Sequence, residues 1–119
     1  MFTIEEITQK LTPVFEAKGV TKATLFGSYA KGDATPESDV DLIVDMEPHI
    51  RGFYVFGVFA DIQEALGGID MDIIHQKDLI PGGKTDTEVK QTGKVIYERL
   101  RQSDYSEDDE ILPRSYILG

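Results

Sequence analysis

The stretch LFGSYAKGDATPESDVDLIV, residues 25–44, decides how this chain of 119 residues folds. Both of its ends are apolar and strand-like, and between them lie a Gly-Ser pair and a loop of turn-forming residues. The second strand carries Asp39 and Asp41 next to Val40 and Leu42. Because an isolated carboxylate is costly to bury, these aspartates require a partner or a function.

Successive side chains of a strand alternate between its two faces. Asp39, Asp41 and Ile43 therefore share one face, and the opposite, aliphatic face is the predicted core. The two aspartates are about 7 Å apart along the backbone at about 3.3 Å per residue, so their carboxylates can converge on one point. A divalent cation would relieve the repulsion between them, and oxygen ligands favour Mg²⁺ or Mn²⁺ over zinc.

A second pair of aspartates, Asp70 and Asp72, lies in IDMDIIH, residues 69–75. If this strand pairs with the strand at 38–45, a third carboxylate joins Asp39 and Asp41. From the residues alone, either Asp70 or Asp72 can be that third carboxylate. For each pair taken alone, an ordinary solvent-facing sheet surface is the alternative interpretation.

Around these strands, hydrophobic periodicity predicts an α/β (α+β) fold: a mixed sheet flanked by helices. Thr3 and Glu6 form a capping-box pattern, and Pro13 predicts a kink or a break near residues 10–12. Residues 53–66 are apolar almost all round, which predicts a largely buried helix. The predicted elements are helices at 3–18, 53–66 and 86–92, a helical turn at 29–31, and strands at 21–27, 38–45, 69–75 and 94–100.

Composition narrows the classes of function. A net charge of −10, from 22 acidic and 12 basic residues, argues against direct binding of nucleic acid and of anionic membranes. The chain has no cysteine, which excludes a thiol nucleophile and fits a reducing cytoplasm. We find neither a signal peptide nor an apolar run long enough to cross a membrane.

Gly27-Ser28, ten residues and then Asp39-Val40-Asp41-Leu42 resembles the signature of the DNA polymerase β-like nucleotidyltransferase superfamily. The longer stretch at residues 25–44 resembles minimal nucleotidyltransferase (MNT) domains, with MDIIH supplying the third carboxylate and QTGKVIYE the closing segment. The similarity runs from about residue 4 to residue 99. MNT proteins of this size are commonly antitoxins encoded beside a HEPN-domain ribonuclease toxin.

The resemblance implies the polymerase β-like fold and a prokaryotic, cytoplasmic enzyme that transfers AMP from ATP to a tyrosine hydroxyl of its partner toxin. Family members often carry arginine where this chain has Lys31. Lysine keeps the positive charge but lacks the planar, forked guanidinium group. By family correspondence, the nucleotide would contact Gly27, Ser28, Lys31 and Ser38. Two Mg²⁺ ions, or Mn²⁺, would be held by Asp39, Asp41 and Asp72, with Asp72 also the base.

Two other functions remain open at this point. The chain could be a non-catalytic antitoxin that occludes its toxin, or a small-molecule nucleotidyltransferase of the antibiotic-modifying type. Intact carboxylates favour catalysis over occlusion, and the missing helical substrate domain disfavours the antibiotic type.

Two parts are expected in the chain: a nucleotidyltransferase domain at residues 1–100 and an acidic C-terminal tail at 101–119. The tail combines SDYSEDDE, residues 103–110, with apolar residues further on. We interpret it as an arm for the HEPN partner, and the alternatives are a disordered tail or a segment that packs on its own domain.

Overall fold

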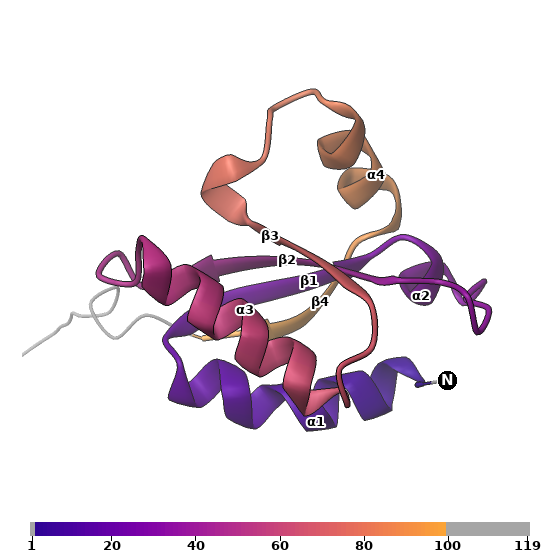
Figure 1. Cartoon of the computed structure of the whole chain (residues 1–119). Helices are drawn as coiled ribbons and strands as arrows, with labels where there is room; N and C mark the ends of the chain where they lie inside the picture. Colours follow the sequence, from indigo (N-terminus) through magenta and orange to yellow (C-terminus); the bar gives the residue numbers. More distant parts are fainter. Residues whose placement is uncertain (1, 100–119) are drawn as a thin grey trace, which may run out of the picture.

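The computed structural model describes residues 2–99, which form a four-stranded sheet with helices on both of its faces (Figure 1). This arrangement confirms the predicted α/β class. In chain order the elements are α1 (Ile4–Ala17), β1 (Val20–Phe26), α2 (Ser28–Lys31), β2 (Val40–Met46), α3 (Phe53–Ala65), β3 (Met71–His75), the 3-10 turn η1 (Gln76–Asp78), α4 (Lys84–Thr92) and β4 (Lys94–Glu98).

The strand order is β3-β2-β1-β4, with β2 and β1 at the centre of the sheet. β1 runs antiparallel to both β2 and β4, while β2 and β3 are parallel. A parallel pair needs a crossover between its strands, and α3 provides it here. The sheet is therefore mixed, as the sequence predicted, and β3 is the immediate neighbour of β2, which carries Asp41 and begins one residue after Asp39.

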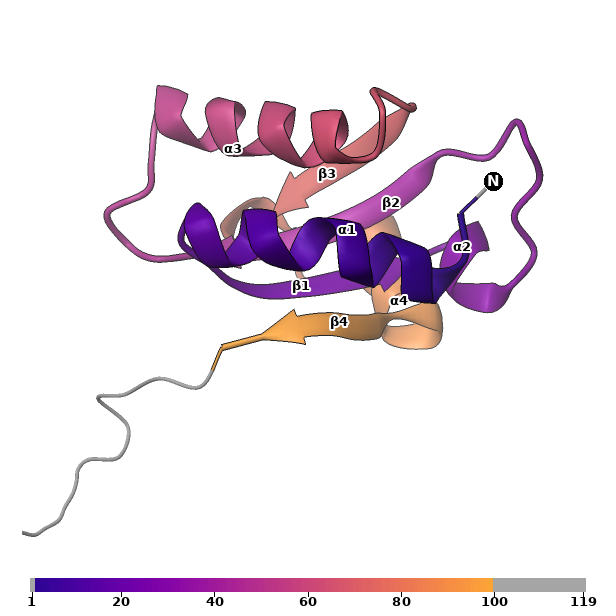
Figure 2. The ribbon, with the colours of Figure 1, turned by 90° about the horizontal axis from the view of Figure 1, so that it is seen from below.

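Helices α1 and α3 cover one face of the sheet, and α4 lies over the opposite face (Figures 1 and 2). The main core lies between the sheet and the first two helices, because the aliphatic side chains of β2 point toward them. Ile43, on the other face of β2, is also buried, since η1 contacts that strand. The core residues include Ile7, Leu11, Phe15, Leu25, Val40, Leu42, Val44, Val58 and Ile62.

Helix α1 begins with the predicted capping box. The Glu6 amide donates to Thr3 Oγ1 at 3.1 Å, and the Thr3 amide donates to Glu6 Oε1 at 2.8 Å. The predicted break near residues 10–12 is wrong, because the helix is continuous through Pro13 to Ala17. Beyond the proline, the fully buried Phe15 holds the last turn against Tyr97, with ring centroids 5.2 Å apart.

Helix α3 corrects a second prediction. Only Val55, Val58 and Ile62 of this helix are buried, whereas Phe53 is 91% exposed and Tyr54 is 77% exposed. The helix is therefore covered on one side only. An all-round apolar sequence suggests burial on every side. It does not show which sides other elements cover, and within residues 2–99 no second layer packs on the outer side of α3.

The predicted acidic tail, residues 101–119, lies outside the residues that the structure describes. Within the described part of the chain, no helix has both the length and the apolar character of a membrane span.

Candidate active site

Asp41 and Asp72 lie directly opposite each other on neighbouring parallel strands. The register of β2 and β3 pairs Val40 with Met71, Asp41 with Asp72 and Leu42 with Ile73. Side chains in register on parallel strands point to the same face, so these two carboxylates emerge together on the side of α4. Asp39 lies just before β2, and its negative charge acts on Asp41.

Asp70 occupies a different position. It lies just before β3, where its carbonyl oxygen accepts a hydrogen bond from the Val40 amide at 3.2 Å. Its side chain lines a separate cavity of about 570 Å³ together with Tyr29 and Ser38. The geometry thus places Asp72, and not Asp70, beside Asp41.

The turn at Gly27 brings backbone against the Asp41 carboxylate. Gly27 has φ of 74° and ψ of −148°, a conformation that residues with a Cβ rarely adopt. A Cβ at this position would overlap Asp41 Oδ2 and would lie 3.5 Å from Glu88 Oε2. Two independent constraints, the positive φ and the lack of space, therefore require glycine here.

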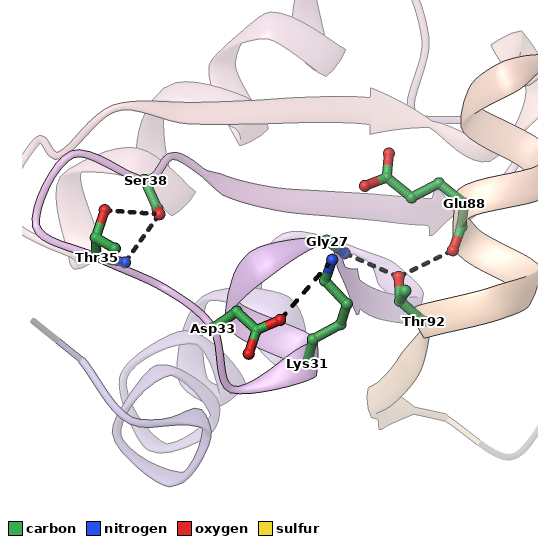
Figure 3. A network of polar contacts seen from close by, with 7 residues as sticks. All are labelled: Gly27, Lys31, Asp33, Thr35, Ser38, Glu88 and Thr92. Atoms are coloured by element: carbon green, nitrogen blue, oxygen red, sulfur yellow. Dashed lines mark hydrogen bonds and ion pairs between the residues drawn. The ribbon is translucent and has the colours of Figure 1, made fainter.

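Helix α4 supplies two residues that the sequence analysis did not single out. Thr92 Oγ1 accepts a hydrogen bond from the Gly27 amide at 2.9 Å and donates one to the Glu88 carbonyl at 2.9 Å (Figure 3). The Glu88 side chain approaches Gly27 and Asp41 from the same helix. Their spacing of four residues was a visible signal of a shared helix face, but nothing local connects that face with Gly27.

The electrostatics of the site concentrate on Asp41. Partial burial raises the pKa of this carboxyl from its ordinary 3.8 to about 6, and the negative charges of Asp72, Glu88 and Asp39 act in the same direction. The groups that shift the pKa of Asp41 are therefore three other carboxylates, and none of these groups is a cation that would offset their charge.

The residues predicted to contact a nucleotide are distributed around this turn. Ser28 opens the short helix α2, and Lys31 ends it with an exposed side chain 4.0 Å from Asp33 (Figure 3). Lys31 also lines a cleft of about 450 Å³ with Lys84 and Glu88. Ser38 lies apart from that cleft, where its hydroxyl accepts from the Thr35 amide at 2.9 Å and so closes a turn before β2.

The donor set fits a hard divalent cation. Among residues 2–99 no three carboxylate or imidazole side chains are gathered closely enough to hold an ion unaided. Mg²⁺ is usually bound by one or two carboxylates together with water and substrate phosphates, and rarely by a closed protein cage. The oxygen-only set of Asp39, Asp41 and Asp72, with its unrelieved repulsion at Asp41, matches that mode.

We expect Gly27→Ala to lower the free energy of unfolding by about 2 kcal/mol or more, because the new methyl group must displace Asp41 and the backbone is strained. Gly32→Ala is the matched control. It has φ of 82° and no atom within 4 Å of an added Cβ, so it tests strain without overlap. Urea unfolding of both variants measures the difference, and equal losses would contradict a contact between Gly27 and Asp41.

We also expect the stability of the metal-free protein to fall as the pH rises from about 4 to about 6. In this window folded Asp41 keeps a proton that the unfolded chain has lost, so the folded state binds more protons. Asp41→Asn should remove this slope and raise stability at pH 8 by roughly 1–2 kcal/mol, a value reduced for partial solvent access. Thermal unfolding at pH 4, 6 and 8 tests this, and a slope that persists in the variant would contradict it.

Comparison with known proteins agrees with this geometry. The family model described as polymerase beta, nucleotidyltransferase, matches residues 9–102. The protein adenylyltransferase MntA of Thermococcus cleftensis is 37% identical over 86 residues, which cover 69% of this chain and 86% of the relative.

Solved structures share the fold. A crystal structure of a toxin–antitoxin with AMP-PNP aligns with a TM-score of 0.63 at 20% identity, over 82% of this chain and 76% of that chain. The tri-AMPylated Shewanella oneidensis HEPN toxin in complex with an MNT antitoxin aligns with a TM-score of 0.60 at 17% identity, over 86% and 76%. These likenesses confirm the predicted polymerase β-like fold. With the family match over most of its length, this chain belongs to the polymerase beta nucleotidyltransferase family.

Proposed function

We propose that this chain is the antitoxin of a HEPN-domain ribonuclease toxin, and that it transfers AMP from Mg-ATP to a tyrosine hydroxyl of that toxin in the cytoplasm of a prokaryote. One observation carries the proposal: Asp41 and Asp72 are in register on neighbouring strands, and the charge of Asp39 acts on the same carboxyl. The relative named a protein adenylyltransferase and the fold shared with a complex of an AMPylated HEPN toxin support it.

The reaction is an in-line displacement at the α-phosphorus of ATP. The tyrosine oxygen forms the new bond to phosphorus, the bond to the bridging oxygen of the β-phosphate breaks, and pyrophosphate leaves. Asp72 takes the proton of the hydroxyl, since it is exposed on the face that an acceptor can approach. The backbone turn at Gly27 and Ser28 and the Lys31 ammonium group orient the triphosphate, with Ser38 at the nucleotide's other end.

Asp39, Asp41 and Asp72 would hold the cations. Two bound Mg²⁺ ions would stabilise the attacking and leaving oxygens and offset the negative charge between ATP and this acidic chain. Before they bind, burial first, and then the charges of Asp72, Glu88 and Asp39, raise the pKa of Asp41. Mn²⁺ satisfies the same oxygen ligands.

The acceptor site is completed by the partner. The catalytic unit is assigned to residues 1–100, and the described part of it contains no second helical domain that could enclose a small-molecule substrate. Asp39 and Asp72 are exposed, so the carboxylate face is accessible to a partner's tyrosine. This openness favours a protein acceptor over an antibiotic.

The decisive experiment incubates the protein with its genomic HEPN neighbour, Mg²⁺ and ATP labelled at the α or the γ phosphate. We expect label on the toxin only from α-labelled ATP, with loss of the toxin's ribonuclease activity. Transfer of the γ label would indicate a kinase. Inhibition of the ribonuclease with no label transferred would indicate occlusion, and omission of Mg²⁺ is the control for the cation.

A further inference from the structure

The outer side of α3 is an uncovered aromatic face. Phe53, Tyr54 and Phe56 are 91%, 77% and 66% exposed, and residues 53–60 contain no charged residue. Gly57 and Ala60 are exposed on the same helix, so the face is notched between its aromatic rings. Phe53 and Phe56 point outward from the buried side, and Tyr54 lies on the flank beside Val58. Several large exposed aromatic side chains on one helix often mark a binding site.

The position of this face argues against the acceptor protein as its occupant. Helix α3 packs on the face of the sheet opposite to α4, and its N-terminal end lies at the far end of the sheet from α2 (Figures 1 and 2). A toxin that presents its tyrosine to Asp41 and Asp72 approaches the α4 side instead. We therefore expect the aromatic face to bind a segment that does not contact Asp41 and Asp72.

The chain itself leaves the described domain next to this face. Arg99 is anchored at the end of β4, where its amide donates to the Thr21 carbonyl at 2.8 Å and its guanidinium pairs with Glu47 at 2.8 Å. Arg99 and Tyr54 line the same cavity of about 450 Å³. The described chain therefore ends beside Tyr54, on the flank of α3 that faces the end of α1, and not on the side of the active site.

The sequence beyond Arg99 has the length and composition to cover the face. Residues 111–118, ILPRSYIL, are mostly apolar, and Ile111 lies twelve positions after Arg99, with eleven residues between them. Twelve residues span up to about 40 Å when extended, while Phe53 to Ala60 extends over only about 10 Å of helix. Tethering also gives the segment an effective concentration of about millimolar, so a modest contact is enough.

We propose that residues 111–118 dock on the aromatic face of α3 within the same molecule. The sequence allows the tail to be a partner arm, a disordered segment or a segment that packs on its own domain, and this proposal is the last of these, with the surface named. The docked segment buries Phe53 and Phe56, and SDYSEDDE, residues 103–110, spans the distance from Arg99. The exclusion of the toxin from this face rests on the proposed nucleotide transfer, whereas the experiments below test the contact without it.

Disulfide trapping in the full chain tests the contact, because the chain has no cysteine of its own. The test pair is Gly57→Cys with Ile117→Cys, and an added Cβ at Gly57 meets no atom within 4 Å, so the aromatic side chains stay intact. The control pair is Ile80→Cys with Ile117→Cys. Ile80 is 73% exposed and apolar, and it lies between η1 and α4, away from α3.

In a glutathione buffer at low protein concentration, we expect the test pair to form its intramolecular disulfide at least tenfold faster than the control pair. Adding Phe53→Ser and Phe56→Ser should reduce that rate to the control value. Equal rates would overturn the proposal. Disulfides that form mainly between molecules would instead indicate a second copy as occupant, and trapping that requires added toxin would indicate the partner; both also overturn it.

A second measurement does not depend on cysteine variants. Ile117→Ser with Leu118→Ser in the full chain should uncover the aromatic face and raise the fluorescence of a hydrophobic dye severalfold. Phe53→Ser and Phe56→Ser in that background should abolish the increase. Unchanged fluorescence in the tail variant would overturn the proposal.

Discussion

Asp39→Asn and Asp41→Asn are each expected to lower AMP transfer by about 10³-fold or more and to weaken Mg-ATP binding. Asparagine keeps the shape of the side chain but removes the charge that a Mg²⁺ ligand must supply. A loss of 10³-fold corresponds to about 4 kcal/mol of transition-state stabilisation, which is within the range that metal ions contribute to such displacements. Label transfer to the toxin measures the first effect, and calorimetry with and without Mg²⁺ measures the second.

Asp45→Asn is the matched control for these two variants. Asp45 lies on β2 four residues beyond Asp41, where it pairs with Lys22 of β1 and its side chain accepts a hydrogen bond from the Met46 amide at 3.0 Å. This variant should retain transfer and Mg²⁺-dependent binding. If Asp39→Asn and Asp41→Asn both behaved like the control, the cation site would not be where the carboxylates converge.

Asp72→Asn is expected to reduce the chemical step by roughly 10²- to 10⁴-fold while nucleotide binding changes much less. The reason is that a general base acts on the acceptor hydroxyl, whereas the triphosphate is held mainly by the turn at Gly27. Single-turnover transfer measures the chemical step separately from calorimetric nucleotide affinity.

Asp70→Asn serves as the comparison because it changes the same residue type two positions earlier. Asp70 lies before β3 and is not in register with Asp41, so its replacement should change transfer less than about threefold. The opposite ranking of the two variants would assign the third carboxylate to Asp70. It would also mean that the register of Asp41 with Asp72 has no catalytic meaning.

The sequence by itself determined the features that depend on neighbours along the chain. The capping box of Thr3 and Glu6 forms because both partners lie within one helical turn. Asp41 and Leu42 point to opposite faces of the sheet because successive side chains alternate in any strand. The Gly27-Ser28 turn and the short helix α2 behind it are likewise local.

The identity of the third carboxylate required the tertiary structure. Asp70 and Asp72 follow the same alternation, and only the pairing of β3 with β2 places Asp72 opposite Asp41. Glu88 and Thr92 could not be assigned because Gly27 and Thr92 are 65 residues apart. Contacts over such separations depend on how the elements pack, and no local pattern encodes them.

Helix α3 shows the same division in its burial. Its sequence determined that residues 53–66 form a helix, since Gly67 and Gly68 follow an uninterrupted run of helix-compatible residues. Whether Phe53 and Phe56 would be buried could not be read from a helix that is apolar on every side. Burial depends on which other elements reach that side, and in the described fold the sheet covers only the side of Val55, Val58 and Ile62.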